Sequence, residues 1–585
     1  MNKKQLLILQ TVITIPFLVF ILIYGSSIST YYLSIPIVLA LFLGFNIFTF
    51  IKKDRVVKPP LLLILVTTFL FYAFTHLGSK EAPQSFEKID INTNSKGVLF
   101  DFKKEQQIDK FCYYIGIDKN IKFRLGYFKN SGKWEKFYNY DKNFPFSFRW
   151  NCEKVNIKTS KIGILVSKGE ATFGEIRFLN KNQLVPFKSK ELKKINDETN
   201  IKIDTTYYGG MFFDEIYFGR TAYEILHKLK IYETTHPFLG KAIISQGIKV
   251  FGMTPFGWRF INVLFGALMI VIIYYLALLI FKNSLYAISS AIILTYSFMH
   301  FTQVRISIID TFGVSFVMLS YYFLYRFIIK QKLSWLLISG IFFGLASAIK
   351  WSAVFASLGF IFISIYLLIS KYPLKKSFAG YRLILYGILS YLIIGLSVYY
   401  LTFYIYMEDN SLSNIIKYQV DMYNYHSALQ ATHPYSSKWW SWIIDYRPMC
   451  YYRNIVGDRF SSITVFGNPA IFWTGILAII YLLYSTLKTN KLESAFILLA
   501  FLGLYLPYIF VGRLMFIYHF YYAVPFLILS IIYMFKNLID KEKLLYFYMV
   551  TVIILFLLYY PVLSGFEVAK WYVDNYLVWF SGWWL

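Results

Sequence analysis

Long apolar runs, separated by short polar breaks, cover most of the chain and predict membrane-spanning helices. The first three runs span about residues 6–24, 31–51 and 60–77, close to the roughly 20 residues that a helix needs to cross a bilayer. After residue 258 the runs resume, and we expect helices over about 260–281, 285–301, 308–329, 334–349, 352–370, 382–404, 466–487, 494–511, 514–535 and 543–562. The pattern predicts a polytopic α-helical membrane protein with about thirteen spans.

Lysines and arginines gather in alternate connections between these runs, which sets an expected orientation. The positive breaks are Lys52–Arg55, Lys282, Lys330–Lys332, Lys371–Arg382, Lys488–Lys491 and Lys536–Lys543. Positive loops stay in the cytoplasm, so the N-terminus is expected there and residues 78–258 and 405–465 outside. The first run has no small-residue cleavage site after it, which favours an uncleaved helix. We expect a multi-pass protein of the plasma (inner) membrane with its chemistry on the extracytoplasmic side.

Residues 78–205 interrupt the apolar pattern with short alternating runs such as Lys122–Tyr127 and Lys161–Val166. Alternation with turn signals between the runs predicts a small β-sandwich. The order of Gly97–Phe102, Ser131–Glu135 and Phe173–Phe178 resembles a discoidin-like (galactose-binding-like) module. The resemblance leaves two roles open, glycan binding and a spacer.

Composition supports the membrane assignment. Hydrophobic residues make up 57% of the 585 and charged residues 16%, whereas soluble domains carry about 25% charged residues. The formal net charge is +27, but lysines and arginines cluster in short runs between the apolar stretches, which indicates cytoplasmic loops and argues against a nucleic-acid partner. None of the three cysteines forms a metal-type pair. Cys112 and Cys152 both lie in the β region and could form a disulfide.

Two adjacent carboxylates, Asp214 and Glu215, precede the helix expected after Trp258. A charge near hydrocarbon is costly unless it is paired or functional. A carboxylate that loses part of its hydration becomes a stronger base. The alternative is structural, because acidic residues also suit the first turn of a helix.

Eight short segments carry a family resemblance. They are Phe213–Glu215, Thr235–Lys241, Pro255–Arg259, Thr302–Asp310, Gly344–Trp351, His433–Trp442, Gly467–Ala470 and Tyr518–Tyr521. In this order they resemble the protein O-mannosyltransferases, GT-C enzymes that use dolichyl or polyprenyl phosphate mannose. The likeness covers about residues 205–585. Phe238 and Ile443 stand where the family often has proline. The eukaryotic carbohydrate-binding insert in the later loop is missing, which indicates a prokaryotic-type member.

The resemblance implies a reaction and roles for residues. Mannose or a related hexose would pass from a polyprenyl (dolichyl or undecaprenyl) phosphate to Ser or Thr hydroxyls of external proteins, with inversion. Asp214 would be the general base, and Glu215 would orient a substrate. Arg259, Arg305 and Lys350 would hold the leaving phosphate; their alternative role is to anchor helices at the membrane interface.

Further residues are expected to line the site or bind substrate: His236, Asp310, His433, Trp439 and Trp440. For His236 a structural role is the alternative. The loop 405–465, with His426 and the tryptophans at 439, 440 and 442, could instead form an interfacial aromatic belt. We expect no required cofactor or metal, although Asp214 and Glu215 could hold a divalent cation with a phosphate.

The resulting division of the chain has seven parts: 1–77, three helices; 78–205, β-sandwich; 206–258, external catalytic loop; 259–404, helices of the GT-C core; 405–465, external loop; 466–562, C-terminal helices; and 563–585, external interfacial tail. The nearest alternative function is a sibling GT-C transferase that glycosylates a lipid or cell-wall polymer. A transporter would show broken helices or repeats in both halves, and a receptor would use the β domain as its working part.

Overall fold

The computed structural model describes residues 59–585 except 91, 93–96, 130–132, 142–146, 193, 196, 371 and 408. The helices expected over 6–24 and 31–51 lie outside this range. The chain divides into two compact units. A helical unit holds the residues up to Thr75, Thr234–Gly240 and Asn262–Leu585, and a β-rich unit holds His76–Glu233 and Lys241–Ile261.

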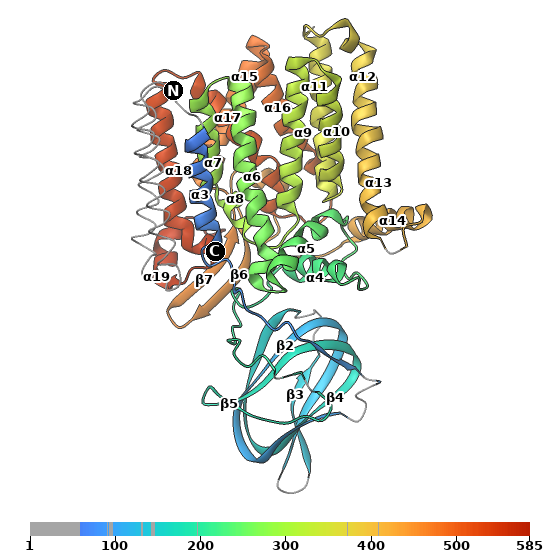
Figure 1. Cartoon of the computed structure of the whole chain (residues 1–585). Helices are drawn as coiled ribbons and strands as arrows, with labels where there is room; N and C mark the ends of the chain where they lie inside the picture. Colours follow the sequence, from blue (N-terminus) through green and yellow to red (C-terminus); the bar gives the residue numbers. More distant parts are fainter. Residues whose placement is uncertain are drawn as a thin grey trace. The chain divides into compact units, whose positions relative to one another are not determined.

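Apolar helices build the helical unit (Figure 1). Within the described residues, seven helical stretches are long and apolar enough to cross a membrane, or eight if a bent pair counts as one span. The seven are α6 (Pro255–Phe281), α9 (Asp310–Lys330), η2–α11 (Trp351–Ile369), α12–η4–α13 (Tyr381–Tyr406), α15 (Pro469–Thr489), α16–η6 (Leu492–Phe510) and α18 (Lys541–Ser564). Shorter apolar helices are α3 (Pro59–Phe74), α10 (Leu333–Ser347) and α17 (Val524–Lys536). A polytopic membrane protein is confirmed, but the expected total of thirteen spans is not.

The run expected as one helix over 285–301 is a broken pair. α7 (Ser284–Thr295) and α8 (Phe298–Val304) meet at 60°. Asn468, which caps α15, donates its side-chain amide to the carbonyls of Tyr296 (3.3 Å) and Val552 (3.0 Å). A residue distant in sequence therefore satisfies a backbone group exposed by the break.

The run expected as a helix over 514–535 also differs. The 3-10 helix η7 (Ile517–Tyr522) comes first, and α17 begins at Val524. Pro525 lies in the first turn of α17, where its missing N–H costs nothing. The preceding residues are therefore separate from the apolar span and carry polar groups.

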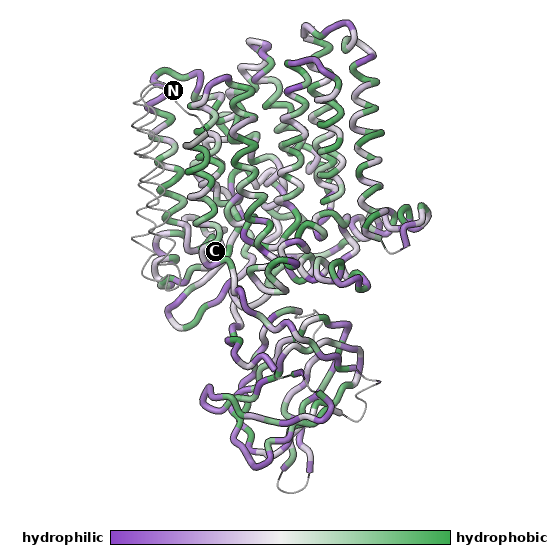
Figure 2. Tube along the Cα trace, viewed as in Figure 1, coloured by the Kyte–Doolittle hydropathy of each residue, from purple (hydrophilic) through white to green (hydrophobic). Residues whose placement is uncertain are grey.

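Both ends of the helical unit can be followed in Figures 1 and 2. The basic connections between α9 and α10, α11 and α12, α15 and α16, and α17 and α18 lie at one end, at the top of the view. At the other end lie α14 (Leu412–Ala428) and the hairpin of β6 (Met449–Val456) and β7 (Arg459–Val465). The segment 405–465 thus contains regular structure.

After α18 the chain forms β8 (Val568–Ala569), α19 (Lys570–Tyr572) and the π-helix η8 (Val573–Leu577). β8 pairs with β7. Trp583 is 2% exposed and donates to the carbonyl of Asp445 (2.8 Å). The tail expected to lie along the membrane interface is therefore partly packed into the protein.

An antiparallel sheet dominates the β-rich unit. Its strands are β1 (Glu87–Asp90), β2 (Val98–Phe128), β3 (Trp134–Tyr140), β4 (Arg149–Asn180) and β5 (Gln183–Val185), in the order β1-β4-β2-β3 with β5 beside β4. The long strands β2 and β4 pair twice: Cys112 lies opposite both Cys152 and Arg177, and Ile164 opposite both Val98 and Leu125. One continuous sheet coils on itself, so the expected sandwich of two separate sheets is not confirmed.

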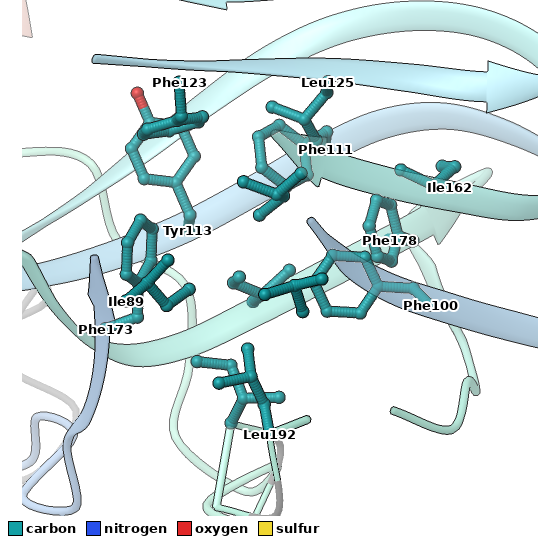
Figure 3. Packing of buried hydrophobic residues seen from close by; sticks show 14 of the residues in the cluster. Ile89, Phe100, Phe111, Tyr113, Phe123, Leu125, Ile162, Phe173, Phe178 and Leu192 are labelled. Atoms are coloured by element: carbon teal, nitrogen blue, oxygen red, sulfur yellow. The ribbon is translucent and has the colours of Figure 1, made fainter. Parts of the chain in front are cut away.

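Alternate side chains of this sheet fill a common core (Figure 3). Phe111, Tyr113, Phe123 and Phe178 are buried there. Burial of aromatic side chains supplies much of the free energy that stabilises a small β domain. Cys112 and Cys152, paired across the strands, are joined by a disulfide, which confirms that bond as one of the alternatives left open by the sequence.

Candidate functional site

Asp214 lies at the start of α4 (Glu215–Leu226) in the β-rich unit. Its carbonyl accepts hydrogen bonds from the N–H groups of Tyr217 (3.0 Å) and Phe218 (3.1 Å). The preceding Phe213 has φ +49°, an uncommon value for a bulky residue, which turns the chain sharply into the helix. The half-buried side chain of Asp214 makes no capping hydrogen bond to α4. Its carboxylate therefore does not serve the helix as a cap.

Glu215 and Arg259 form a fully buried ion pair. Nε of Arg259 donates to Glu215 Oε1 and Nη2 donates to Oε2, both at 2.7 Å. Arg259 also donates to the carbonyls of Leu77 (2.8 Å) and Gly210 (2.9 Å), and Trp258 Nε1 donates to Glu215 (3.2 Å). These contacts join the two ends of the 206–258 segment. Glu215 and Arg259, which were both expected to contact substrate, instead bond to each other.

Arg305 is also engaged by the protein. It follows α8 and is 4% exposed. Its Nη1 donates to the carbonyls of Tyr72, Ala73 and Thr75 (3.1, 2.6 and 2.7 Å), and Nη2 donates to that of Ser564 (3.2 Å). These carbonyls lie at the C-terminal ends of α3 and α18, where helix carbonyls lack intrahelical donors. Arg305 therefore supplies hydrogen-bond donors to the C-terminal ends of two helices, α3 and α18.

The partly exposed Lys350 and the buried Asp310 form an ion pair in the helical unit. Lys350 follows α10, and Asp310 is the first residue of α9. Lys350 Nζ lies 2.9 and 3.0 Å from the two carboxylate oxygens of Asp310. The Lys350 side chain keeps 14% exposure and lies 5.6 Å from the ring centre of Tyr518. Lys350, which the sequence predicted to hold the leaving phosphate, is therefore accessible to a ligand.

The segment Thr235–Gly240 lies against the residues next to this pair. The Leu239 N–H donates to the carbonyl of Ala348 (3.3 Å). A Cβ on Gly240 would come within 2.7 Å of Ile309 Cγ2, so only glycine allows this approach. The motif Thr235–Lys241 thus brings His236 to the same end of the helical unit as Lys350.

His236, His426 and Arg513 form a second polar group. The rings of His236 and His426 are 5.3 Å apart. His426 Nε2 lies 2.8 Å from the Thr235 carbonyl, and Arg513 Nη1 donates to His426 Nδ1. Burial, and then the nearby His236 and Arg513, lower the pKa of His426 to about 4. Sequence reasoning missed Arg513, although a charged residue between two apolar runs was a usable signal.

The segment His433–Trp442 packs on the residues that follow Arg513. The Ser437 N–H donates to the Met515 carbonyl (2.9 Å), and the His433 ring lies 5.2 Å from that of Phe516. Trp442 is buried and stacks with His519 at 5.9 Å. Trp439 packs on Tyr505 at 5.5 Å, whereas Trp440 is 53% exposed. Trp439 and Trp442 therefore pack inside the protein, whereas Trp440 lies on its surface.

An apolar groove of about 780 Å³ lies between α10, α11 and the α12–α13 span, and Ser347 and Trp351 are among its lining residues. Its walls include side chains that are about half exposed, such as Ile361 and Leu392. One end is polar: Trp351 Nε1 donates to the Tyr399 hydroxyl (2.9 Å), which donates to Gln419 Oε1 (2.5 Å). The polar end of the groove therefore lies at Trp351, the residue that directly follows Lys350.

Two further acidic residues, Asp445 and Glu233, are buried and were not among the residues expected at the site. Asp445 is 1% exposed and accepts from the Gly467 N–H (2.8 Å), and burial raises its pKa well above the usual range. In the β-rich unit Lys241 is fully buried and bonds to Glu233 at 2.6 Å. The spacing of Arg220 and Glu224, an i,i+4 ion pair at 2.9 Å, was a readable signal for the same region.

One acidic group among the described residues has donor atoms close enough to hold a metal ion: Glu175, Asp197 and Glu198. Glu175 already accepts from Arg177 (3.1 Å) and from the Glu198 N–H (2.9 Å). Burial, the largest influence, raises its pKa. At Asp214–Glu215, where a cation was considered from the sequence, both oxygens of Glu215 bond to Arg259.

Two sequence models of one family match the chain. Residues 235–400 match the model described as dolichyl-phosphate-mannose-protein mannosyltransferase. Residues 411–583 match the C-terminal four-transmembrane region of protein O-mannosyltransferase. Together the two matches cover more than half of the chain and nearly all of the described helical unit.

Curated relatives and a solved structure agree with these matches. The polyprenol-phosphate-mannose–protein mannosyltransferase of Corynebacterium glutamicum is 24% identical over 60% of this chain and 81% of its own length. That of Mycolicibacterium smegmatis is 21% identical over 64% and 88%. The Saccharomyces cerevisiae Pmt1–Pmt2 complex bound to the sugar donor shares the fold: the TM-score is 0.56 at 13% identity, over 63% of this chain and 88% of that one. The chain therefore belongs to the protein O-mannosyltransferase family, the membrane glycosyltransferases whose sugar donor is a polyprenyl phosphate mannose.

Proposed function

We propose that the protein transfers mannose from a polyprenyl phosphate to Ser or Thr hydroxyls of proteins outside the cytoplasm. The observation that carries this proposal is the match of both halves of the helical unit, 235–400 and 411–583, to the two family models. The names of the actinobacterial relatives specify a polyprenol phosphate mannose donor and a protein acceptor.

The apolar groove fits the donor's chemistry. A polyprenyl chain is apolar and lies in the bilayer, and the groove is lined by side chains of apolar, lipid-facing helices. Its polar end contains Trp351, the residue after Lys350, and the Lys350 side chain keeps 14% exposure beside Asp310. Negative charge grows on the phosphate as the sugar leaves, and a fixed cation stabilises that charge. We propose Lys350 as a phosphate ligand, with no metal required.

Asp214 is the proposed general base. The acceptor hydroxyl oxygen bonds to the anomeric carbon, the bond from that carbon to the phosphate oxygen breaks, and the hydroxyl proton passes to the Asp214 carboxylate. Attack on the face opposite the phosphate inverts the anomeric centre, and the polyprenyl monophosphate leaves. The carboxylate of Glu215, held by Arg259 at 2.7 Å, is assigned to orient the turn that carries Asp214.

The distribution of basic loops supports an extracytoplasmic site in the plasma membrane. The basic connections lie at one end of the helical unit and α14 with the β6–β7 hairpin at the other (Figure 2). Positive loops mark the cytoplasmic side. Lys350 follows α10, and its neighbour Trp351 packs 6.3 Å from His426 of α14, so this end is the proposed outer one.

A transfer assay with the purified full chain tests the function. It offers undecaprenyl phosphate mannose and other sugar phosphates with two acceptors, a Ser/Thr-rich peptide and a lipid fraction, and reads products by mass spectrometry. We expect a hexose on the peptide hydroxyls. Exclusive transfer to the lipid would replace the protein acceptor. Asp214→Asn should lower turnover about 10²- to 10⁴-fold with an unchanged unfolding temperature, and full activity would remove Asp214 as base.

A further inference from the structure

We propose that Arg513 is a second ligand of the donor phosphate and that His426 is the residue that positions it. The proposal rests on the proposed function, since it concerns the same donor. It replaces two of the three cations expected from the sequence, Arg259 and Arg305, whose guanidinium groups are buried against a carboxylate and backbone carbonyls.

Arg513 has the environment of a ligand-binding cation. It lies in the connection between η6 and η7 and is half-buried. Its contacts are a hydrogen bond to His426 Nδ1 and a long one from Nε to the Leu514 carbonyl (3.5 Å). Among the described residues no carboxylate pairs with it. An arginine without an acidic partner keeps its planar set of donors for a phosphate.

His426 fixes the direction of the Arg513 side chain. It comes from α14, and its ring is held from two sides, by the Thr235 carbonyl at 2.8 Å and by the Trp351 ring at 6.3 Å. With Nε2 donating to Thr235, Nδ1 is an acceptor, which suits an arginine donor. The imidazole therefore orients the guanidinium without neutralising it.

Arg513 and Lys350 both influence the pKa values of two histidines, His519 and His426. Both lower the pKa of His519, after the larger effect of burial, and both lower that of His426. Against these two cations, Asp310 supplies one carboxylate, bonded to Lys350 at 2.9 Å. The cluster therefore has an excess of positive charge where the groove ends, which suits the charge of a phosphodiester.

The backbone next to Arg513 is also held in place. Met515 accepts from the Ser437 N–H at 2.9 Å, and Phe516 packs on His433 at 5.2 Å. Phe516 also bonds to His519 Nδ1. A cation on a fixed loop loses little conformational entropy when it binds a ligand.

Binding of undecaprenyl monophosphate to the full chain, followed by tryptophan fluorescence, tests the assignment. Arg513→Gln should weaken binding about ten- to hundred-fold. The matched control is Arg453→Gln, since Arg453 is exposed on β6, and it should bind as wild type does. If Arg513→Gln binds the monophosphate as tightly as the wild type does, the inference fails and the proposed function stands. No binding by the wild type overturns the proposed donor, and the inference with it.

One further variant separates a phosphate ligand from a packing residue. Arg513→Lys keeps the charge and should bind the monophosphate better than Arg513→Gln. If both variants lose binding equally and unfold at a lower temperature, Arg513 is a packing residue and the inference fails.

His426→Phe and His426→Gln test the positioning role. Phenylalanine removes both hydrogen-bonding atoms, whereas glutamine keeps one donor and one acceptor. His426→Phe should raise the KM for the donor about tenfold with the KM for the acceptor peptide unchanged, and His426→Gln should restore most of the loss. Equal changes in both KM values, or no rescue by glutamine, would overturn the positioning role.

Discussion

Arg259 and Arg305 differ from Lys350 and Arg513 in what surrounds their charges, although all four lie at helix ends. Arg259 is fully buried and Arg305 is 4% exposed, and backbone carbonyls accept from both. Lys350 keeps 14% side-chain exposure, and Arg513 is half-buried with a histidine as partner. Burial with complete pairing stabilises a fold, whereas a partly exposed cation with spare donors can bind a ligand.

The difference follows from the cost of moving charge out of water. A buried charge requires partners for its donors, because desolvation otherwise outweighs any gain from packing. Such partners also block substrate. A partly exposed cation keeps part of its hydration and can exchange that water for phosphate oxygens. The division into structural and chemical cations therefore depends on the partners of each charge.

Breaking the buried pair should have the largest effect. Arg259→Met leaves Glu215 buried without its cation, which costs roughly 3–5 kcal/mol. We expect a much lower unfolding temperature and yield in detergent, and partial recovery when Glu215→Leu is added. Wild-type stability combined with a loss of donor binding would instead make Arg259 a phosphate ligand, as expected from the sequence.

Removing the exposed cation should affect chemistry more than folding. Lys350→Met should lower turnover about 10²- to 10³-fold, the size of effect seen when one stabilising group is removed from a transition state. The unfolding temperature should change little when Asp310→Asn is added, because Asp310 is 3% exposed and would otherwise be left buried without its cation. Turnover measured with undecaprenyl phosphate mannose, beside the unfolding curve, checks both parts. A large loss of stability would place Lys350 with the structural cations.

Much of the helical unit could be predicted, because each membrane helix is visible in the sequence as its own apolar run. The run expected over 308–329 became α9 and that over 466–487 became α15, with shifts of a few residues. The break between Thr295 and Phe298 could not be read, because Asn468, which donates to the carbonyl of Tyr296 at the break, is far away in sequence. The coiling of β2 and β4 was likewise hidden, because alternation gives the faces of a strand and not its partners.

The candidate site was only partly readable. Lys350 and Asp310, placed together by the structure, were both named from motifs. Nothing local shows that Glu215 would take Arg259 as its partner, since the two are far apart in sequence. Arg513 was missed because its meaning comes from His426 of another element. A motif identifies residue types, and the three-dimensional partners decide the role of each charge.

Acid should loosen the packing around His426. The pKa of His426 is lowered from 6.5 to about 4 by burial, His236, Arg513 and Lys350. Between these values the unfolded segment binds a proton that the folded one does not, so local stability falls as pH drops from 6.5 to 4 and levels off below. Relative to the intrinsic rate at each pH, hydrogen exchange of α14 should quicken by roughly tenfold or less from pH 7 to 5. His426→Phe should remove this dependence, and an unchanged one would assign it to another group.

The smallest effect should come from filling the groove, because this change affects binding of the lipid tail of the donor and not of its phosphate. A Cβ on Gly387 meets nothing within 4 Å, and Gly387 lines the groove. Gly387→Leu fills that space, and each methylene group of a long polyprenyl chain that it displaces from the groove should weaken binding about fourfold. A donor with a short isoprenoid chain should bind as before, because Lys350 and its neighbours are untouched. Leu477→Phe, on the exposed face of α15 at 63% exposure, is the matched control. Equal weakening of both donors would show that the groove acts through the helices and does not hold the tail.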